Sequence, residues 1–398
     1  MEIHGGTGGM TTELELTGSG ETIGLQQQVA RLQALLEASR HVHSTVSEEE
    51  VLRVVLRIVV RELEMAGAAF RQEGMSYGEV PETPGDVADQ ALPIYLLADR
   101  EGRRLTELMV NPPEGRPLSL YEADFLEGLA LQAAVALENA RNHERNLHFA
   151  RVQQDMDAAR NIQRSLLPHK LPEIKGYSVG FRSDTCYEVG GDYLDIVEQP
   201  DGQLLMVVAD VAGKGLASAM MSTIFRSTFR ALAAGGLPLA ELATRMNELH
   251  WAEGEEARRR YVTAIFLRLQ PDTGALEVTN AGHNPGFLVS ANKSVRMFES
   301  TGTPLGMLPG MQYGSETAVL EPDSRLLFYT DGLTEVFRGE EEFGEERLLD
   351  VFSKCPSQKA DDILDALWAE LTEYAAGGAQ SDDMTALSLS RSGVEWEI

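Results

Sequence analysis

The feature of this 398-residue chain that most constrains its fold is a series of aspartates at the ends of apolar strands. Asp192 follows two glycines in VGGDYLDIV, and Asp210 ends the apolar run in LLMVVADVAGKG. Asp331 lies between an apolar run and a glycine in RLLFYTDGLTE. Asp382 and Asp383 stand directly before a predicted strand in SDDMTALSL. A fold that buries these runs leaves the acidic side chains at strand ends, and the neighbouring glycines allow close backbone approach.

The chemistry of such a set points to a cation. A single aspartate at a strand end is ordinarily a turn former or a helix cap, but four such sites are harder to explain in that way. Gathered carboxylates raise each other's pKa and are stable together mainly around a cation. Oxygen ligands favour Mg²⁺ or Mn²⁺, and the eight histidines and two cysteines show no metal-ligand spacing. Two such ions about 4 Å apart can activate water and hold a phosphoryl group for displacement.

The second half of the chain has the pattern of an α+β domain. From Gly176 onward, apolar strand patterns alternate irregularly with three predicted helices, Leu216–Ala234, Leu239–His250 and Ala360–Tyr374. This order lacks the regular strand–helix–strand alternation of a doubly wound sheet, so it favours α+β.

The N-terminal part divides into a leader and a small domain. Residues 1–24 are rich in Gly and Thr without an apolar period, which predicts a disordered leader. Residues 25–145 have the order helix, short strands, helix, and with the string LALQAAVALENAR they resemble a GAF sensor domain. A generic α+β regulatory domain is the alternative. Because the middle is short and has few polar residues to grip a cofactor, we expect this domain to transmit a signal or to dimerise.

A long helix is predicted between the two parts. Its pattern runs from about Leu120 to Leu167, where Pro168 ends it. In its second half, apolar positions recur at alternating spacings of 3 and 4: Phe149, Val152, Met156, Ala159, Gln163 and Leu166. This heptad pattern favours a parallel coiled coil, hence a homodimer, with residues 146–172 as a helical linker. A single amphipathic helix packed on the next domain is the alternative.

Charge and cysteine content exclude several functions. The chain has 34 Lys+Arg against 62 Asp+Glu, a formal net charge of −28, which disfavours nucleic acid and anionic membranes as partners. Cys186 and Cys355 have neither metal-ligand spacing nor the number of a disulfide scaffold. No apolar stretch approaches the roughly 20 residues of a membrane span, and no signal pattern is present. We therefore expect a cytoplasmic protein.

Five segments, VGGDYLD, DVAGKG, NAGHNP, TDGLTE and SDDMT, occur in this order, and together they resemble the PPM-type metal-dependent protein serine/threonine phosphatases. The resemblance is strongest to the bacterial branch of stage II sporulation protein E and the RsbU regulators. The string ARNIQRSLLPHKLPEIKGY is similar to the segment that introduces the catalytic domain in that branch. The resemblance covers residues 155–391, and we place the phosphatase domain at residues 173–391.

The resemblance implies a sandwich of two antiparallel sheets flanked by helices, with a binuclear Mn²⁺ or Mg²⁺ site. Asp210 would bridge both ions. Asp192 and the backbone carbonyl of Val211 would complete the shell of one ion. Asp331 and Asp382 would hold the other. A water bridging the ions would then attack phosphoserine or phosphothreonine directly, without a covalent phosphoenzyme.

Two further acidic residues and two departures from the family pattern accompany the expected ligands. Asp195 and Asp383 are expected to support the ligands or to lie at the surface. The family often has an aromatic residue where Leu194 stands and Ser where Ala212 stands. Neither departure removes a metal ligand.

Other residues of these motifs leave alternatives open. Gly213 and Gly215 are expected to bring backbone close to the metals. Lys214 either contacts substrate phosphate or is a solvated lysine. His283 and Asn284 in NAGHNP form either a structural turn or a contact at the rim of the active site.

Two expectations concern the region after these motifs. Four apolar side chains at helical spacing are predicted to lie in the core: Met220, Met221, Ile224 and Phe225. The charge-rich stretch EGEEARRR, residues 253–260, is predicted to be a flexible solvated loop, with a substrate-specificity loop as the alternative.

These inferences predict a two-domain, dimeric phosphoprotein phosphatase whose N-terminal domain controls the catalytic domain through the helix. The resemblance implies a phosphorylated STAS-type anti-anti-sigma factor as the substrate. A catalytically silent scaffold that binds a phosphorylated partner is the alternative. A divalent-metal nuclease or nucleotide hydrolase is less well supported, because the sequence has neither a Walker-type loop nor a basic track.

Overall fold

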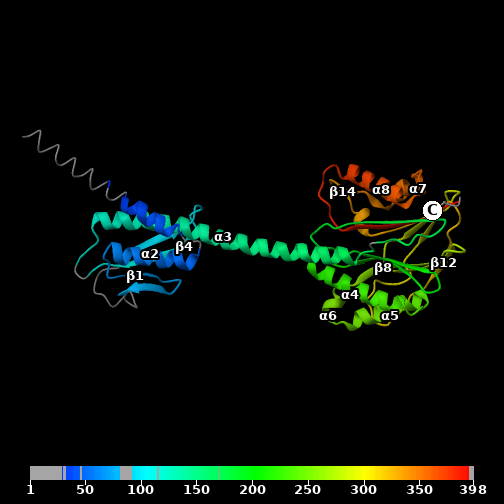
Figure 1. The fold of residues 1–398 in the computed structure, drawn as a ribbon, viewed down its shortest axis with the longest axis horizontal. Coiled ribbons are helices and arrows are strands. Elements are labelled where there is room, and N and C mark those ends of the chain that lie inside the picture. The colour runs from blue at the N-terminus through cyan, green and yellow to red at the C-terminus, as the bar shows by residue number, and fades with distance from the viewer. Residues whose placement is uncertain are drawn as a thin grey trace, which may run out of the picture. The chain divides into compact units, whose positions relative to one another are not determined.

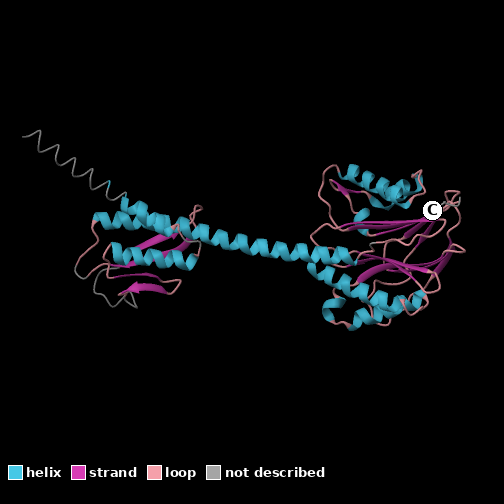
Figure 2. Cartoon of the chain, viewed as in Figure 1, coloured by secondary structure: helices cyan, strands magenta, loops and turns pink. Residues whose placement is uncertain are grey.

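The computed structural model describes residues 29, 33–44, 47–80, 92–113, 116–168 and 170–393. The chain divides into two compact units, residues 1–153 and 154–398, and Figures 1 and 2 show their helices and strands. The leader expected at residues 1–24 lies outside the described residues. Among the described helices, none combines the length and the apolar content needed to cross a membrane.

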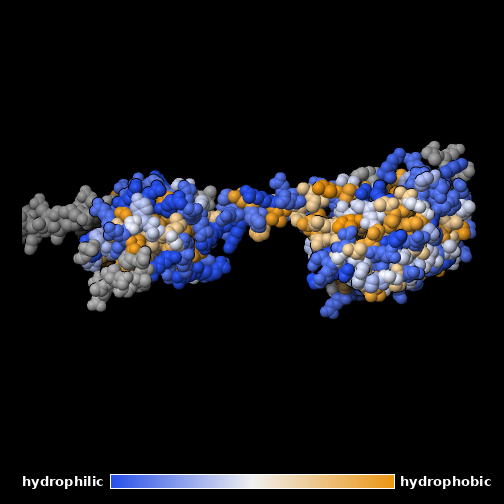
Figure 3. Space-filling model, turned by 90° about the horizontal axis from the view of Figure 1, so that it is seen from below, coloured by the Kyte–Doolittle hydropathy of each residue, from blue (hydrophilic) through white to orange (hydrophobic). Residues whose placement is uncertain are grey.

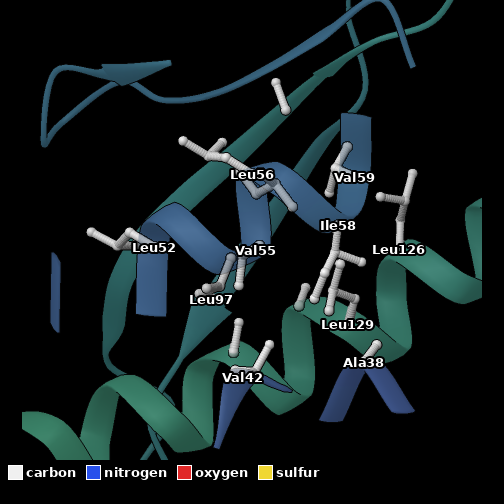
Figure 4. Packing of buried hydrophobic residues seen from close by; sticks show 14 of the residues in the cluster. Ala38, Val42, Leu52, Val55, Leu56, Ile58, Val59, Leu97, Leu126 and Leu129 are labelled. Carbon is white, nitrogen blue, oxygen red and sulfur yellow. The ribbon is translucent and has the colours of Figure 1, made fainter. Parts of the chain in front are cut away.

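The first unit packs helices against one antiparallel sheet with the strand order β2-β1-β4-β3. Its strands are β1 Gly67–Phe70, β2 Met75–Gly78, β3 Ile94–Ala98 and β4 Arg104–Asn111. Helix α2, Glu48–Glu62, starts after Ser47 with three glutamates in its first turn, where they complement the helix dipole. Figure 4 shows its buried side chains, among them Val55 and Ile58, beside Leu126 and Leu129 of the next helix.

Helix α3, Leu120–Leu166, follows this sheet and is 47 residues long. Ser119 and Glu122 cap its start reciprocally: the Glu122 carboxylate accepts from the Ser119 N–H (2.7 Å), and the Ser119 hydroxyl accepts from the Glu122 N–H (3.2 Å). Its buried residues all lie between Glu122 and Ala140. Beyond them, apolar side chains such as Phe149 (68% exposed) reach the surface, and Figure 3 shows apolar surface along this part of the helix.

The second unit contains two five-stranded antiparallel sheets, ordered β11-β10-β13-β16-β5 and β12-β9-β8-β7-β6. The first sheet consists of β5 Tyr177–Asp184, β10 Gly286–Val289, β11 Val295–Phe298, β13 Arg325–Tyr329 and β16 Met384–Arg391. The second consists of β6 Tyr193–Glu198, β7 Leu204–Val211, β8 Val262–Gln270, β9 Ala275–Ala281 and β12 Glu316–Val319. A short hairpin, β14 Phe337–Arg338 and β15 Glu341–Glu342, lies outside both sheets.

Three hydrophobic layers hold this unit together. Between the sheets, apolar side chains such as Val208, Ile265 and Phe328 form one cluster. Helices α4 Leu216–Ala233 and α5 Leu239–Ala252 cover the outer face of the second sheet. Helices α7 Gly344–Lys354 and α8 Ala360–Ala375 cover the outer face of the first. The predicted α+β architecture, with two antiparallel sheets flanked by helices, is therefore present (Figure 2).

Two local expectations are wrong in part; of the four side chains predicted to lie in the core, Met221 does pack against it. Met220 is 60% and Ile224 is 38% exposed, whereas Phe225 is buried. The buried face of α4 runs through Ser218, Ser222, Phe225 and Phe229, so the two exposed side chains lie on a different face of the same helix.

The predicted loop at residues 253–260 contains a short helix, α6 Glu255–Arg258. Ion pairs one turn apart support it, Arg259 with Glu255 (2.8 Å) and Arg260 with Glu256 (2.9 Å). The charges that suggested a solvated loop therefore pair with one another around a helical turn.

Candidate functional site

The fold brings the predicted aspartates to the ends of neighbouring strands in both sheets. Asp192 directly precedes β6 and Asp210 lies near the end of β7; these strands are antiparallel, with Tyr193 opposite Ala209. Asp331 follows β13 in a 3₁₀ turn, Asp331–Leu333, and Asp382 precedes β16. Since β13 and β16 are antiparallel neighbours, the end of one lies beside the start of the other.

The charges of these carboxyl groups act on one another. Burial, followed by the charges of Asp210 and Asp383, raises the pKa of Asp192 well above its ordinary range. Burial and the charges of Asp331, Asp382 and Asp383 raise the pKa of Asp210. The pKa of Asp331 is also raised, by burial and by the charge of Asp382. The site therefore concentrates negative charge that a bound cation would stabilise.

Thr330 fixes the position of Asp192. Its hydroxyl donates to Asp192 Oδ2 (2.8 Å) and accepts from the Thr385 backbone N–H (3.0 Å). One buried threonine thus joins a carboxylate of the second sheet's edge to β16 of the first sheet.

Asp383 joins two loops rather than facing solvent. It is 7% exposed, and its carboxylate accepts from the backbone N–H groups of Cys186 and Gly191, both at 2.8 Å. The expectation that it supports the site fits these contacts, whereas a surface position does not. Gly332 packs against the same residue so closely that a Cβ there would lie 1.9 Å from the Asp383 carbonyl oxygen, which requires glycine.

Gly191 leaves open space between two of the expected ligands. A Cβ on this residue would lie 2.8 Å from the Val211 carbonyl oxygen and 3.2 Å from Asp210 Oδ1. Both oxygens therefore face the same small volume, which a larger residue would fill.

The atoms expected to bind the metal are all oxygens, which are the ligands that hard divalent ions prefer. The ligands expected from the sequence, Asp192, Asp210, Asp331, Asp382 and the Val211 carbonyl, would all bind through oxygen, and the charges of neighbouring aspartates raise the pKa of Asp192, Asp210 and Asp331. Across the described residues, no three His, Cys, Asp or Glu side chains already converge at ligating distance. In this structure Asp192 instead accepts a hydrogen bond from Thr330, and Asp382 pairs with Lys214 (2.8 Å).

Asp195 belongs to a different structure, a buried ion pair. It is fully buried, and the Arg230 guanidinium of α4 binds it through two hydrogen bonds of 2.6 and 2.7 Å. The Tyr193 hydroxyl also donates to it. This pair fastens α4 to β6, and the sequence gives no sign of it because Arg230 is 35 residues away.

The NAGHNP segment forms a tight turn. Asn280 accepts from the His283 N–H (2.8 Å) and donates to the His283 carbonyl oxygen (3.1 Å). The His283 imidazole is buried, with Nδ1 2.9 Å from the Thr263 hydroxyl oxygen. These contacts favour the structural alternative for His283.

The end of α3 binds the loop that carries Asp192. The Gln163 side chain donates to the Gly190 carbonyl oxygen (2.6 Å) and accepts from the Gly190 N–H (3.1 Å). Arg160 donates to the Glu188 carbonyl oxygen (2.8 Å). The heptad pattern predicts Gln163 in a coiled-coil seam, whereas here its amide holds the backbone two residues before Asp192.

Comparison with known families identifies this part of the chain. Residues 200–392 match the family model of stage II sporulation protein E (SpoIIE). This segment lies within the second unit and is similar to SpoIIE. The matched segment includes Asp210, Asp331 and Asp382, and it begins after Asp192.

Three curated proteins are related to the chain. Protein IcfG of Synechocystis sp. is 26% identical over 263 residues, which cover 60% of this chain and 41% of that protein. Phosphoserine phosphatase RsbP of Bacillus subtilis is 24% identical over 58% of this chain and 56% of its own length. Phosphoserine phosphatase RsbU of the same organism is 24% identical over 46% of this chain and 54% of its own length. The chain thus spans about half the length of these relatives.

One solved structure establishes the fold of the second unit. The SiaA-PP2C domain of Pseudomonas aeruginosa aligns with a TM-score of 0.53 at 22% identity, covering 63% of this chain and 99% of that one. The domain therefore has a PP2C fold, and the serine phosphatases RsbU and RsbP are among its homologues.

Proposed function

We propose that this protein is a metal-dependent phosphatase that hydrolyses phosphoserine or phosphothreonine on a partner protein. The observation that carries this proposal is the set of coupled aspartates at strand ends of both sheets, in a domain homologous to phosphoserine phosphatases. A protein gains nothing in stability from carboxylates that repel each other at the edge of its core, so their presence favours a functional role.

Two Mn²⁺ or Mg²⁺ ions are the proposed cofactors. Asp210 would contact both ions, with Asp192 and the Val211 carbonyl on one side and Asp331 and Asp382 on the other. When bound, the ions activate the attacking water and neutralise charge that develops on the phosphoryl oxygens.

The chain's own contribution is to hold the oxygen ligands in place. Thr330 orients Asp192 by donating to it. Asp383 ties the loop that precedes Asp192 to the start of β16, and Gly191 keeps the space beside Val211 free. Such preorganisation removes reorganisation cost from the reaction step.

Substitution of the central ligands tests the proposal. Asp210→Asn or Asp331→Asn should lower Mn²⁺-dependent phosphate release from a phosphoprotein by at least about a hundredfold, because each removes a charged ligand. Asp272→Asn, at an exposed turn between β8 and β9, is the matched control and should leave the rate unchanged. Turnover near that of the unchanged protein in either ligand variant would contradict the assignment.

We further propose that the substrate is a phosphorylated STAS-type anti-anti-sigma factor. The relatives RsbU and RsbP are phosphoserine phosphatases, which supports a phosphoserine substrate, and the sequence resemblance to the RsbU branch implies the STAS class. Purified protein should release phosphate from a phospho-STAS protein in the presence of Mn²⁺ and much more slowly from an unrelated phosphoserine protein. Binding of the phospho-STAS protein without turnover would favour the silent scaffold instead.

Regulation by the first unit completes the proposal. We propose that residues 25–145 form a GAF-like domain that dimerises, and that residues 146–172 transmit its state to a phosphatase domain at residues 173–391. The continuous helix Leu120–Leu166, with exposed apolar side chains in its second half, supports this arrangement.

A further inference from the structure

Lys214 contacts the site in a way that neither of its sequence-based alternatives describes. Its ammonium lies 2.8 Å from Asp382 Oδ2 and donates a hydrogen bond to the Ser381 carbonyl oxygen (2.7 Å). Two acceptors from adjacent residues therefore hold it at the start of β16. Asp382 is one of the oxygen ligands proposed for the divalent ions.

The ammonium also acts on the other carboxylates. Its charge lowers the pKa of Asp210 and of Asp331, opposing the rise that burial and the neighbouring aspartates cause. In the protein without ions, Lys214 thus supplies part of the positive charge that this acidic site needs. A divalent ion would supply twice that charge at the same carboxylate.

The loop that carries Lys214 has a glycine on each side of it and open space around both glycines. Gly213 and Gly215 flank it with φ values of 103° and 78°, which glycine adopts freely. Apart from the neighbouring residues of the chain, no heavy atom lies within 4 Å of a Cβ built on either glycine, so the surroundings leave room for movement. The Lys214 side chain is itself 46% exposed, so its ammonium can move into water.

We propose that Lys214 is an internal competitor of the divalent ion at Asp382: its ammonium holds the carboxylate when no ion is bound, and ion binding requires this ion pair to open. The inference rests on the proposed metal site and adds a residue that sets its affinity. The competition makes metal occupancy depend on the conformation of the Gly213–Gly215 loop.

Titration of the full-length protein with Mn²⁺ by calorimetry, without substrate, tests the inference. Lys214→Met should bind Mn²⁺ about fivefold more tightly, since a half-exposed ion pair contributes up to about 1 kcal/mol. Lys214→Arg keeps the cation and should stay close to the unchanged protein. Lys354→Met removes a similar pair with Asp350 on α7, which involves no residue of the site, and should leave Mn²⁺ affinity unchanged.

Each of the other possible results contradicts one part of the proposal. Equal or weaker Mn²⁺ binding by Lys214→Met overturns the competition. A raised KM for phosphoprotein with unchanged Mn²⁺ affinity also overturns it, and assigns Lys214 to the substrate phosphate. If Asp382→Asn binds Mn²⁺ as well as the unchanged protein does, the proposed metal site itself fails at Asp382, and the competition fails with it.

Discussion

At the scale of single residues, side chains that are close in the sequence can lie in different parts of the structure. Asp192 and Asp195 are three positions apart, yet Asp192 faces the other carboxylates and Asp195 is buried against Arg230. Leu194 between them points into the layer between the sheets. Alternation along β6 separates the side chains in this way, so the motif VGGDYLD combines a candidate ligand with a structural anchor.

His283 gives a pH-dependent prediction. Burial lowers the pKa of His283 to about 4, from about 6.5 for an exposed histidine. Below pH 6.5 the unfolded chain therefore binds a proton that the folded protein resists, and stability falls as the pH drops toward 4. Between pH 7 and pH 5, the unchanged protein should lose about 2 kcal/mol more of its free energy of unfolding than His283→Asn does.

Urea denaturation at both pH values measures this difference. Acidic groups whose pKa the fold raises act in the opposite direction, but they are common to both proteins and cancel in the comparison. Equal losses in the two proteins would show that the imidazole accepts a proton in the folded state.

Residue types and spacing predicted the candidate ligands, but not the groups that hold them. Asp210 and Asp331 stand out because a charged residue directly beside a buried run is unusual. Thr330 and Arg230 do not stand out, because threonine and arginine occur throughout such chains. Their roles come from contacts across 138 and 35 residues, which depend on the final packing.

At the scale of elements, the local sequence pattern predicted most of the helices, but it did not predict the order of the strands in the sheets. Helix α3 ends at Leu166, one residue from the predicted end, because Pro168 acts locally. Helix α7 is absent from the predicted helices, although its buried residues Leu348 and Phe352 lie four positions apart, as one face of a helix requires. The pairing of β16 with β5 joins segments about 200 residues apart, and no local signal specifies it.

The junction between α3 and the loop before Asp192 gives a prediction at this scale. Gln163→Leu removes both hydrogen bonds to Gly190 and should lower Mn²⁺-dependent turnover about tenfold, because two hydrogen bonds of about 1 kcal/mol each fix this loop. The protein should remain folded by circular dichroism. Asn161→Ala, exposed on the same helix, is the matched control.

Gln163→Glu separates positioning from simple destabilisation. The carboxylate can still accept from the Gly190 N–H but repels the Gly190 carbonyl oxygen, so turnover should fall between that of the unchanged protein and Gln163→Leu. Turnover of Gln163→Leu equal to that of the Asn161→Ala control would show that the loop is fixed without this contact.

At the scale of the whole molecule, charge and metal binding are connected. The chain carries a formal net charge of −28, and two divalent ions at the proposed site would offset about four of these charges. Most of the acidity therefore lies elsewhere, and it accords with a partner that is neither nucleic acid nor an anionic membrane.

The continuous helix α3 gives the last prediction. If residues 146–172 transmit a rotation of the helix from one end to the other, phosphatase activity depends on how far the two ends are rotated relative to each other about the helix axis. Two alanines inserted after His148 rotate one end by about 200° relative to the other, whereas seven alanines rotate it by about 20° while adding about 10 Å of length. We expect the two-residue insertion to change phosphatase activity at least about threefold and the seven-residue insertion to leave it nearly unchanged. Equal activity in both would mean that α3 is only a tether, and a larger effect from seven residues would mean that length rather than orientation carries the signal.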